Sequence, residues 1–147
     1  MKAFPRDITR VILLSSAVHE LRNSIAQGPR EYEQCGFLFG EESNGQAVIK
    51  TASAAENIYF ARDKFAIGDR EYSRALHREC VGQRLLGIYH THLGRAVMSG
   101  QDERNAALHR FLWLLIGIFD SPHLAWEWKC FKPALRAIEE VSLEIGA

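Results

Sequence analysis

The chain has 147 residues, and its composition of 47% hydrophobic and 24% charged residues is ordinary for a globular protein with a buried core. Its 18 basic and 18 acidic residues cancel, so no excess of charge directs it to nucleic acid or to an anionic membrane surface. No apolar run reaches the roughly 18 residues of a membrane helix, and the N-terminal residues MKAFPRDITR lack the apolar core of a signal peptide. We therefore expect a single domain over residues 1–147 in the cytoplasm, while the sequence gives no indication of the oligomeric state.

The first periodic segment, residues 11–27, predicts an amphipathic helix. Its apolar side chains follow one another at steps of four, three and four residues, which aligns them on one helical face: Leu14, Val18, Leu21 and Ile25. Gly28 and Pro29 come next and end the helix, because glycine favours a helix C-terminus and proline cannot continue a helix.

Three strands are expected after this helix. The apolar run Cys35–Phe39 has the length of a strand, and Asn44 with Gly45 marks a hairpin turn, since both residues tolerate a positive φ. The returning strand should cover residues 46–51. A further strand is expected over residues 57–61.

A second helix and another strong strand follow. Asp69 is of the residue type that caps helix N-termini, and the predicted helix extends from it to Cys80, with Tyr72 and Leu76 on the same face. Residues 85–91 are apolar until they reach two histidines. This pattern predicts a core strand whose tip extends to an active-site cleft.

The remaining segments complete a mixed α/β domain. Ser99 can cap a helix over residues 101–111, residues 112–119 predict a buried strand, and residues 124–131 predict a strand with one aromatic face. The pattern of residues 136–145 is compatible with a strand or a helix. Together these elements predict an α/β fold in which a central β-sheet is flanked by helices.

The cysteines give no sign of a disulfide or a zinc knuckle. Cys35, Cys80 and Cys130 are odd in number and lie in or beside apolar segments. We therefore expect buried thiols that behave as small hydrophobic side chains.

Residues that could bind a metal or take part in catalysis are concentrated between Tyr89 and Asp102. This stretch reads YHTHLGRAVMSGQD. His90 and His92 are two residues apart, and on a strand this spacing puts both imidazoles on one face. The aspartate follows at the start of a predicted helix, where the helix dipole favours a carboxylate. Two imidazoles and one carboxylate leave the fourth position of a tetrahedral zinc open, as in catalytic sites, and Ser99 offers a hydroxyl close by.

The histidine pair with Ser99 and Asp102 resembles the signature of the JAMM metalloproteases, also called the MPN-plus or JAB family. A second match lies upstream in residues 33–40 (EQCGFLFG), where the family has a glutamate before a strand that begins with Cys or Met and glycine. The resemblance covers roughly residues 11–131, and the expected order of elements agrees with it. It implies the JAMM/MPN fold, a cytidine-deaminase-like architecture, and one zinc ion bound by the two histidines and the aspartate.

The chain departs from the family pattern in one loop. Leu93 stands where the family usually has proline, and six residues instead of seven separate His92 from Ser99. We therefore expect the loop from Leu93 to Met98 to have a different shape, with Gly94 adding backbone freedom.

The resemblance also assigns catalytic roles. Glu33 would be the general base that takes a proton from water and passes it to the leaving amine, because it stands three residues before Gly36, as in the family. Glu31 is the competing carboxylate, since it can face the same side of an extended segment. Ser99 would help to stabilise the oxyanion that develops on the scissile carbonyl, although serine is also a common N-cap.

The activity that the resemblance implies is that of a zinc-dependent peptidase or isopeptidase. Small relatives of this kind act on ubiquitin-like or sulfur-carrier proteins and cut after the C-terminal glycine tail, and the resemblance implies this substrate class for the chain. The alternative is a protein-binding module of the same fold with weak or no activity. The presence of all three expected ligands favours the enzyme.

Overall fold

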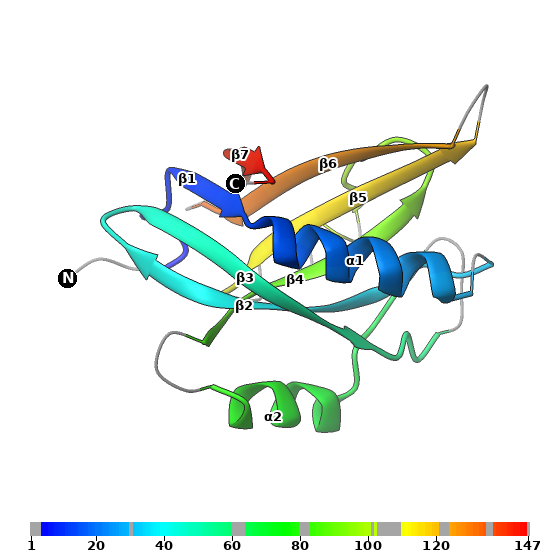
Figure 1. Ribbon diagram of the computed structural model, residues 1–147, viewed down its shortest axis with the longest axis horizontal. Helices are drawn as coiled ribbons and strands as arrows, with labels where there is room; N and C mark the ends of the chain where they lie inside the picture. Colours follow the sequence, from blue (N-terminus) through cyan, green and yellow to red (C-terminus); the bar gives the residue numbers. More distant parts are fainter. Residues whose placement is uncertain are drawn as a thin grey trace.

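The computed structural model describes residues 4–29, 31–59, 64–79, 83–100, 102, 110–120, 124–134 and 137–146. Within them, the elements follow one another as β1 (Arg10–Leu13), α1 (Ser15–Gln27), β2 (Cys35–Ser43), β3 (Gln46–Ala55), α2 (Asp69–His77), β4 (Arg84–Leu93), β5 (Leu112–Asp120), β6 (Leu124–Pro133) and β7 (Ile138–Ile145). Figure 1 shows α1 lying across the strands on one side of the molecule and α2 set apart below β2.

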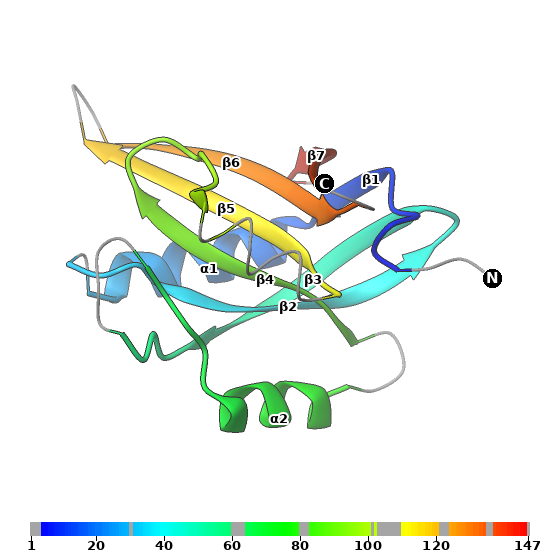
Figure 2. The same cartoon turned by 180° about the vertical axis from the view of Figure 1, so that it is seen from behind.

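The seven strands form one sheet that closes on itself in the order β1-β3-β2-β4-β5-β6-β7. β1 joins the two ends of the sheet, because it pairs in parallel with both β3 and β7. β4 and β5 also pair in parallel, whereas the other neighbouring strands are antiparallel. Seen from either side, β4 lies between the half of the sheet that contains β2 and β3 and the half that contains β5 and β6 (Figures 1 and 2).

The prediction of a central sheet flanked by helices is therefore wrong, because the described residues form a closed barrel of strands with two short helices. The error starts near the N-terminus, where the helix predicted over residues 11–27 includes most of β1. Val11 and Leu13 are both buried, and Val11 also fits the helical spacing three residues before Leu14. The pairing of β1 with two strands that are far away in the sequence makes residues 11–13 a strand instead of a helix. A local pattern contains no information on such contacts.

Three further strand predictions change in the structure. β3 extends beyond the predicted end of its strand at residue 51. Asn57–Tyr59 lies in a loop, so the described part of the strand predicted over residues 57–61 is wrong. The sequence leaves residues 136–145 undecided between strand and helix, and the structure shows strand β7 there. β7 pairs with β1, which lies far away in the sequence, so local spacing could not predict the pairing.

The helices differ from the predictions mainly at their ends. Gly68 occupies the N-cap of α2, which places Asp69 in the first turn instead of at the cap. α2 ends at His77 with Arg78 as its C-cap, so the prediction that this helix reaches Cys80 is wrong. Of the helix predicted over residues 101–111, Asp102 is helical, residues 110 and 111 are not, and the rest lie outside the described residues. No helix in the described part of the chain combines the length and the apolarity that crossing a membrane requires.

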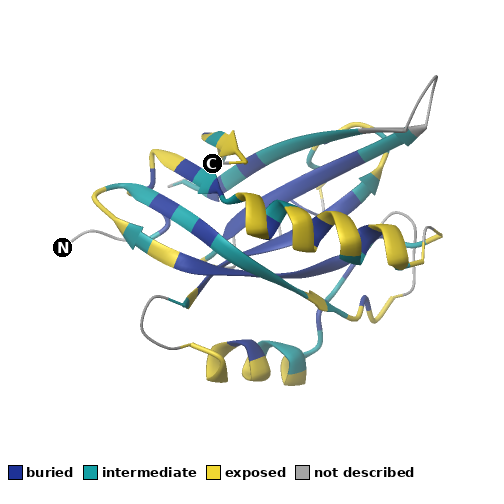
Figure 3. Cartoon of the chain, viewed as in Figure 1, coloured by how far each residue is buried: buried dark blue, intermediate teal, exposed yellow. Residues whose placement is uncertain are grey.

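Apolar side chains gather in two clusters on the two faces of the central strands. One cluster contains Leu38 and Tyr89 together with the buried face of α1, which consists of Ala17, Leu21 and Ile25. The other contains Phe37 and Ile88, and Ala75 of α2 belongs to it. Side chains alternate between the faces of a strand, so the residues that follow Ile88 at even spacing on β4 point to the second cluster. Figure 3 shows that burial is concentrated in these central strands.

Candidate metal centre

The end of β4 delivers two imidazoles to one point. His90 and His92 are on the same face of the strand, and their Nε2 atoms are 3.3 Å apart. His90 is fully buried, and its ring stacks on Phe65 with 4.3 Å between the ring centroids. Trp113 of β5 contacts the same imidazole edge-on at 5.6 Å. The apolar cluster therefore fixes the orientation of His90, whereas His92 stays partly exposed.

Thr91, between the histidines, points to the other face and ties β4 to the segment before β2. Its hydroxyl accepts a hydrogen bond from the backbone N–H of Gln34 at 2.8 Å. Its own backbone N–H donates to the Gln34 carbonyl, also at 2.8 Å. These two bonds hold the residue next to Gln34, which is Glu33, alongside the histidine pair.

The carboxylate of Asp102 completes a triangle of potential ligand atoms. Its Oδ2 lies 3.3 Å from Nε2 of His90 and 2.9 Å from Nε2 of His92. A tetrahedral zinc ion about 2.0–2.1 Å from each ligand would keep the ligand atoms about 3.3–3.4 Å apart. The three atoms therefore have the spacing of one face of a zinc coordination tetrahedron.

Asp102 and Ser99 hold each other through reciprocal hydrogen bonds. The Ser99 hydroxyl oxygen accepts from the backbone N–H of Asp102 at 3.0 Å, and the Asp102 carboxylate accepts from the backbone N–H of Ser99 at 3.1 Å. This is the arrangement of an N-terminal cap. Because the serine oxygen acts only as an acceptor here, its O–H hydrogen can still be donated to another group.

Glu33 lies on the remaining side of the histidine pair. It is buried, and its Oε1 is 3.3 Å from Nε2 of His92. Ligand atoms of Glu33, His90 and His92 all lie within 4.8 Å of one another, which makes these residues a second possible metal-binding trio. The trio that contains Asp102 is tighter, since none of its three separations exceeds 3.3 Å. Glu31, the competing carboxylate in the sequence, is exposed.

The protonation of His90 and Asp102 suits metal binding, whereas that of His92 opposes it. Burial lowers the pKa of His90 below its ordinary value and keeps the imidazole neutral. Burial also opposes a charge on Asp102, but hydrogen bonds with His90 and His92 outweigh it and hold the pKa of the carboxyl well below its usual range. Burial opposes a charge on His92, but the bond to Asp102 and the charges of Asp102 and Glu33 outweigh it and raise the pKa, so a metal must displace a more tightly held proton from this ring. An ionised carboxylate and imidazoles with a free lone pair are the forms that a metal requires.

The shortened loop after His92 is anchored on β5 and β6. Glu127 binds the guanidinium of Arg95 through both carboxylate oxygens, at 3.1 and 2.8 Å, and accepts from the backbone N–H of Ala96 at 2.7 Å. Beneath the loop lies Gly117, where an added Cβ would come within 2.5 Å of backbone atoms of Gly94 and Ala96. The loop therefore depends on a glycine and a carboxylate from distant strands for its course toward Ser99.

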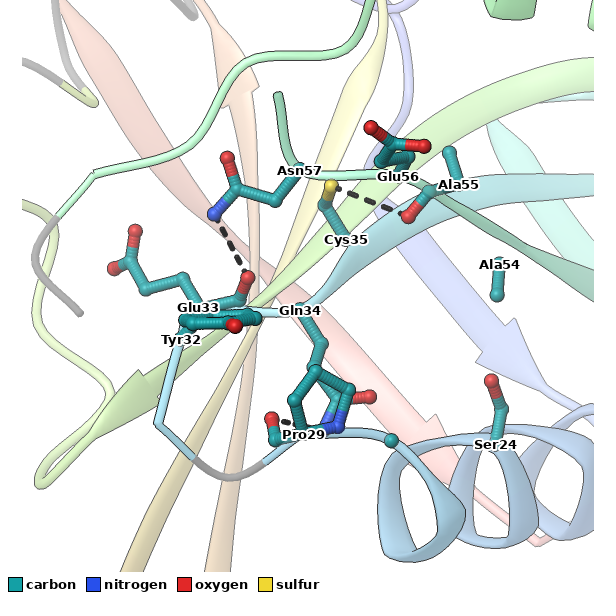
Figure 4. A pocket seen from close by; sticks show the side chains of 11 residues that line it. Ser24, Pro29, Tyr32, Glu33, Gln34, Cys35, Ala54, Ala55, Glu56 and Asn57 are labelled. Carbon is teal, nitrogen blue, oxygen red and sulfur yellow. Dashed lines mark hydrogen bonds between the residues drawn. The ribbon is translucent and has the colours of Figure 1, made fainter. Parts of the chain in front are cut away.

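A pocket of about 260 Å³ opens beside Glu33 (Figure 4). It lies between the end of α1, the start of β2 and the end of β3, and its lining residues are Ser24, Gly28, Pro29, Tyr32, Glu33, Gln34, Cys35, Ala54, Ala55, Glu56 and Asn57. Burial and the nearby charge of Glu33 raise the pKa of Cys35 to about 12. The thiol therefore stays protonated, and Cys35 is no nucleophile.

Several residues that shape the site carry no signal in the sequence. Thr91 stands between two histidines in a motif where the middle position looks arbitrary, and Phe65 lies in a segment without periodicity. Gly117 and Glu127 are on strands whose predicted role was only to build the sheet. Their contacts join segments that are far apart in the chain, so only the folded structure reveals them.

Comparison with known proteins gives one family and a fold. The sequence matches the family described as prokaryotic homologs of the JAB domain over residues 15–130. Among solved structures, the solution structure of protein DSY2949 from Desulfitobacterium hafniense is similar, with a TM-score of 0.74, 20% sequence identity and coverage of 92% of each chain. At this identity the likeness shows the fold alone. No curated protein sequence matches the chain.

Proposed function

The chain belongs to the family of prokaryotic JAB-domain homologues, as its motifs predict, and on this premise we propose that it is a zinc-dependent peptidase or isopeptidase. The observation that carries the proposal is the triangle of ligand atoms from His90, His92 and Asp102, whose sides of 2.9–3.3 Å suit a tetrahedral zinc ion. We assign these three residues as the ligands. Glu33 belongs to the looser set, and we assign it the role of base.

When bound, zinc would supply Lewis acidity that activates water and polarises the scissile carbonyl. Glu33 is placed beside His92 to accept a proton from the attacking water and to return it to the nitrogen of the leaving amine. Burial keeps this carboxylate out of bulk water. The Ser99 hydroxyl, held on the backbone of Asp102, would donate a hydrogen bond to the oxyanion that develops on the substrate.

The proposed substrate is the C-terminal glycine tail of a ubiquitin-like or sulfur-carrier protein. The side chains of His90, Asp102 and Glu33 are at most 5% exposed, and His92 is 16% exposed. Among these four side chains most of the exposure belongs to His92, and such limited access suits a thin, extended chain with small side chains next to the scissile bond. We further propose a cytoplasmic protein without nucleic-acid or membrane partners, as the composition predicts.

The first test is the metal itself. His92→Ala removes one corner of the triangle and should abolish stoichiometric zinc, because two ligands remain, while the barrel survives, since its apolar clusters do not depend on the site. Elemental analysis of wild type and variant, both purified without added metal, measures this. Equal zinc content in the two proteins would contradict the ligand assignment.

The second test separates an enzyme from a binding module with the same fold. Zinc-loaded protein should cleave a ubiquitin-like protein fused through its glycine tail to a reporter, and mass spectrometry should place the cut after the last glycine. A protein that contains zinc and binds the fusion without cleaving it would establish the binding module instead.

A further inference from the structure

Asn57, two residues after the end of β3, has a buried side-chain amide with every hydrogen-bonding position in use. Its Nδ2 donates to the carbonyl of Glu33 at 2.9 Å and to the carbonyl of Lys64 at 3.1 Å. Its Oδ1 accepts from the backbone N–H groups of Tyr59 at 3.1 Å and Ala66 at 3.3 Å. A side-chain amide has two donor hydrogens and two acceptor lone pairs, so these four bonds saturate it. Figure 4 shows the bond from Asn57 to Glu33 at the edge of the pocket.

One arm of this network reaches the proposed base. Glu33 lies just before β2 and thus outside the regular ladder of the sheet. Its neighbour Gln34 is fixed to Thr91, and its own carbonyl is fixed to Asn57. The backbone of Glu33 is therefore held from both sides, with its carboxylate 3.3 Å from His92.

The other arm reaches a proposed ligand. The bonds from Asn57 to Lys64 and Ala66, together with the bond from the Ile58 N–H to the Ala66 carbonyl at 3.0 Å, bring residues 64–67 back to the end of β3. Phe65 lies in this returning segment, is 5% exposed, and stacks on the imidazole of His90. The side-chain amide of Asn57 thus determines the position of the Phe65 ring beside His90.

We propose that Asn57 is a positioning residue. It fixes the Glu33 carboxylate and the stacked rings of Phe65 and His90 in their positions relative to each other at the metal centre. It touches neither substrate nor metal, and it acts through the backbone of Glu33 and through the loop that carries Phe65. The catalytic part of this inference rests on the proposed function, whereas the structural part can be measured without any turnover.

The activity test uses Asn57→Ala, with Val141→Ala as a control of stability. Val141 is buried on β7 beside Cys130, in a different apolar cluster from Phe65. For Asn57→Ala we expect one zinc per chain, a KM close to wild type and a kcat about 10- to 100-fold lower, since a shift of about 1 Å in a reacting group costs this much. For Val141→Ala we expect a lower Tm with unchanged kcat. Equal kcat and equal zinc content in the two variants would overturn the proposal.

The structural test uses NMR of the intact protein. The amide hydrogens of Tyr59 and Ala66 should exchange slowly in wild type and fast in Asn57→Ala. The His90 ring hydrogens should lie upfield in wild type because of the Phe65 ring current, and Phe65→Leu gives the reference position without the ring. The His90 signals of Asn57→Ala should move toward this reference. Unchanged exchange and unchanged His90 signals would refute the proposal even in a protein without measurable activity.

Asn57→Asp keeps the test decisive if the alanine variant does not fold. It retains Oδ1 as acceptor for Tyr59 and Ala66, but it replaces the donor to Glu33 with an oxygen. We expect slow exchange at the two amides together with a loss of kcat as large as for Asn57→Ala. Wild-type kcat in Asn57→Asp would show that the bond to Glu33 positions nothing. A wild-type protein that binds zinc but cleaves nothing would instead refute the proposed function, and the NMR outcome would still decide the role of Asn57.

Discussion

Glu33 and Glu31 are two residues apart, yet the fold treats them differently. Glu33 is buried and faces His92, whereas Glu31 is exposed. Glu33→Gln keeps the size of the side chain but cannot take a proton. We expect near-normal zinc content, near-normal stability and a loss of turnover of at least about 100-fold, the lower range for general acid–base catalysis. Glu31→Gln should have little effect, and zinc quantitation beside a cleavage assay of both variants measures the difference.

This pair of variants also distinguishes the two possible ligand sets. A base contacts water and leaves the metal in place when it is replaced, whereas a ligand takes the metal with it. Loss of zinc from Glu33→Gln would therefore favour the trio of Glu33, His90 and His92 over the trio that contains Asp102. If Glu31→Gln loses activity and Glu33→Gln does not, the assignment of Glu33 as the general base is wrong.

The described cysteines should not react with alkylating reagents in the folded protein. Cys35 and Cys130 are free and buried, and burial raises the pKa of each thiol to about 12. Iodoacetamide attacks the thiolate, so native protein at pH 8 should leave both residues unmodified, and unfolding in guanidinium should expose them. Peptide mass spectrometry gives the modification at each position. Rapid labelling of Cys35 in folded protein would indicate that the segment between Glu33 and β2 opens in solution.

At the scale of elements, the loop after β4 is the segment whose different shape the sequence predicts. Leu93 is the last residue of β4, and the loop begins at Gly94, which adopts a φ of 133° in open space. Contacts with neighbouring strands hold the loop in place. Glu127 of β6 holds Arg95 and Ala96, and Gly117 of β5 lets the loop backbone approach. The course of the loop toward Ser99 is thus set by β5 and β6.

Gly117→Ala tests this dependence. Its Cβ would meet backbone atoms at 2.5 Å, so the loop must shift. We expect a stability loss of about 1–3 kcal/mol, as for other overpacked sites, and a kcat that is lower by about 10-fold or more, because Ser99 moves with the loop. Gly68→Ala is the matched control, since its Cβ would meet only a side-chain methyl at 3.9 Å. Equal kcat in the two variants would show that the loop tolerates displacement.

At the scale of the whole molecule, β1 closes the barrel. It is the shortest strand of the described sheet, yet it pairs on both sides, with β3 through residues 46–49 and with β7 through residues 142–145. A strand paired on both sides cannot accept proline, because proline removes a backbone donor and clashes with its neighbours. The first turn of a helix accepts it readily.

A pair of proline substitutions follows from this difference. Ile12→Pro, in the middle of β1, should destabilise the protein by about 3 kcal/mol or more. Ser15→Pro, at the first position of α1, should cost much less, because Leu14 before it is already extended, with ψ at 153°, and only the hydroxyl bond to the Gly146 carbonyl is lost. Chemical denaturation measures both. A protein that tolerates proline at residue 12 would contradict the assignment of β1 and favour the helix that the sequence predicts over residues 11–27.

The grouping of His90, His92, Ser99 and Asp102 is the part of this protein that the sequence determines by itself. The period of two along a strand puts His90 and His92 on one face wherever that strand lies, and the reciprocal bonds with Ser99 hold the carboxylate three residues later. The motif also identifies the family. These relations are local, so spacing alone specifies them, and most strands and α1 follow from spacing in the same way.

Tertiary structure decided the rest. The closure of the barrel through β1 and β7 joins the two ends of the chain, and the periodicity at residues 11–13 fits a helix as well as a strand. The burial of Glu33 beside His92, the bonds of the Asn57 amide and the close approach at Gly117 depend on contacts between segments that are distant in the sequence. Such contacts form only when the whole sheet has assembled, because their free energy comes from burial and from hydrogen bonds between elements rather than within them.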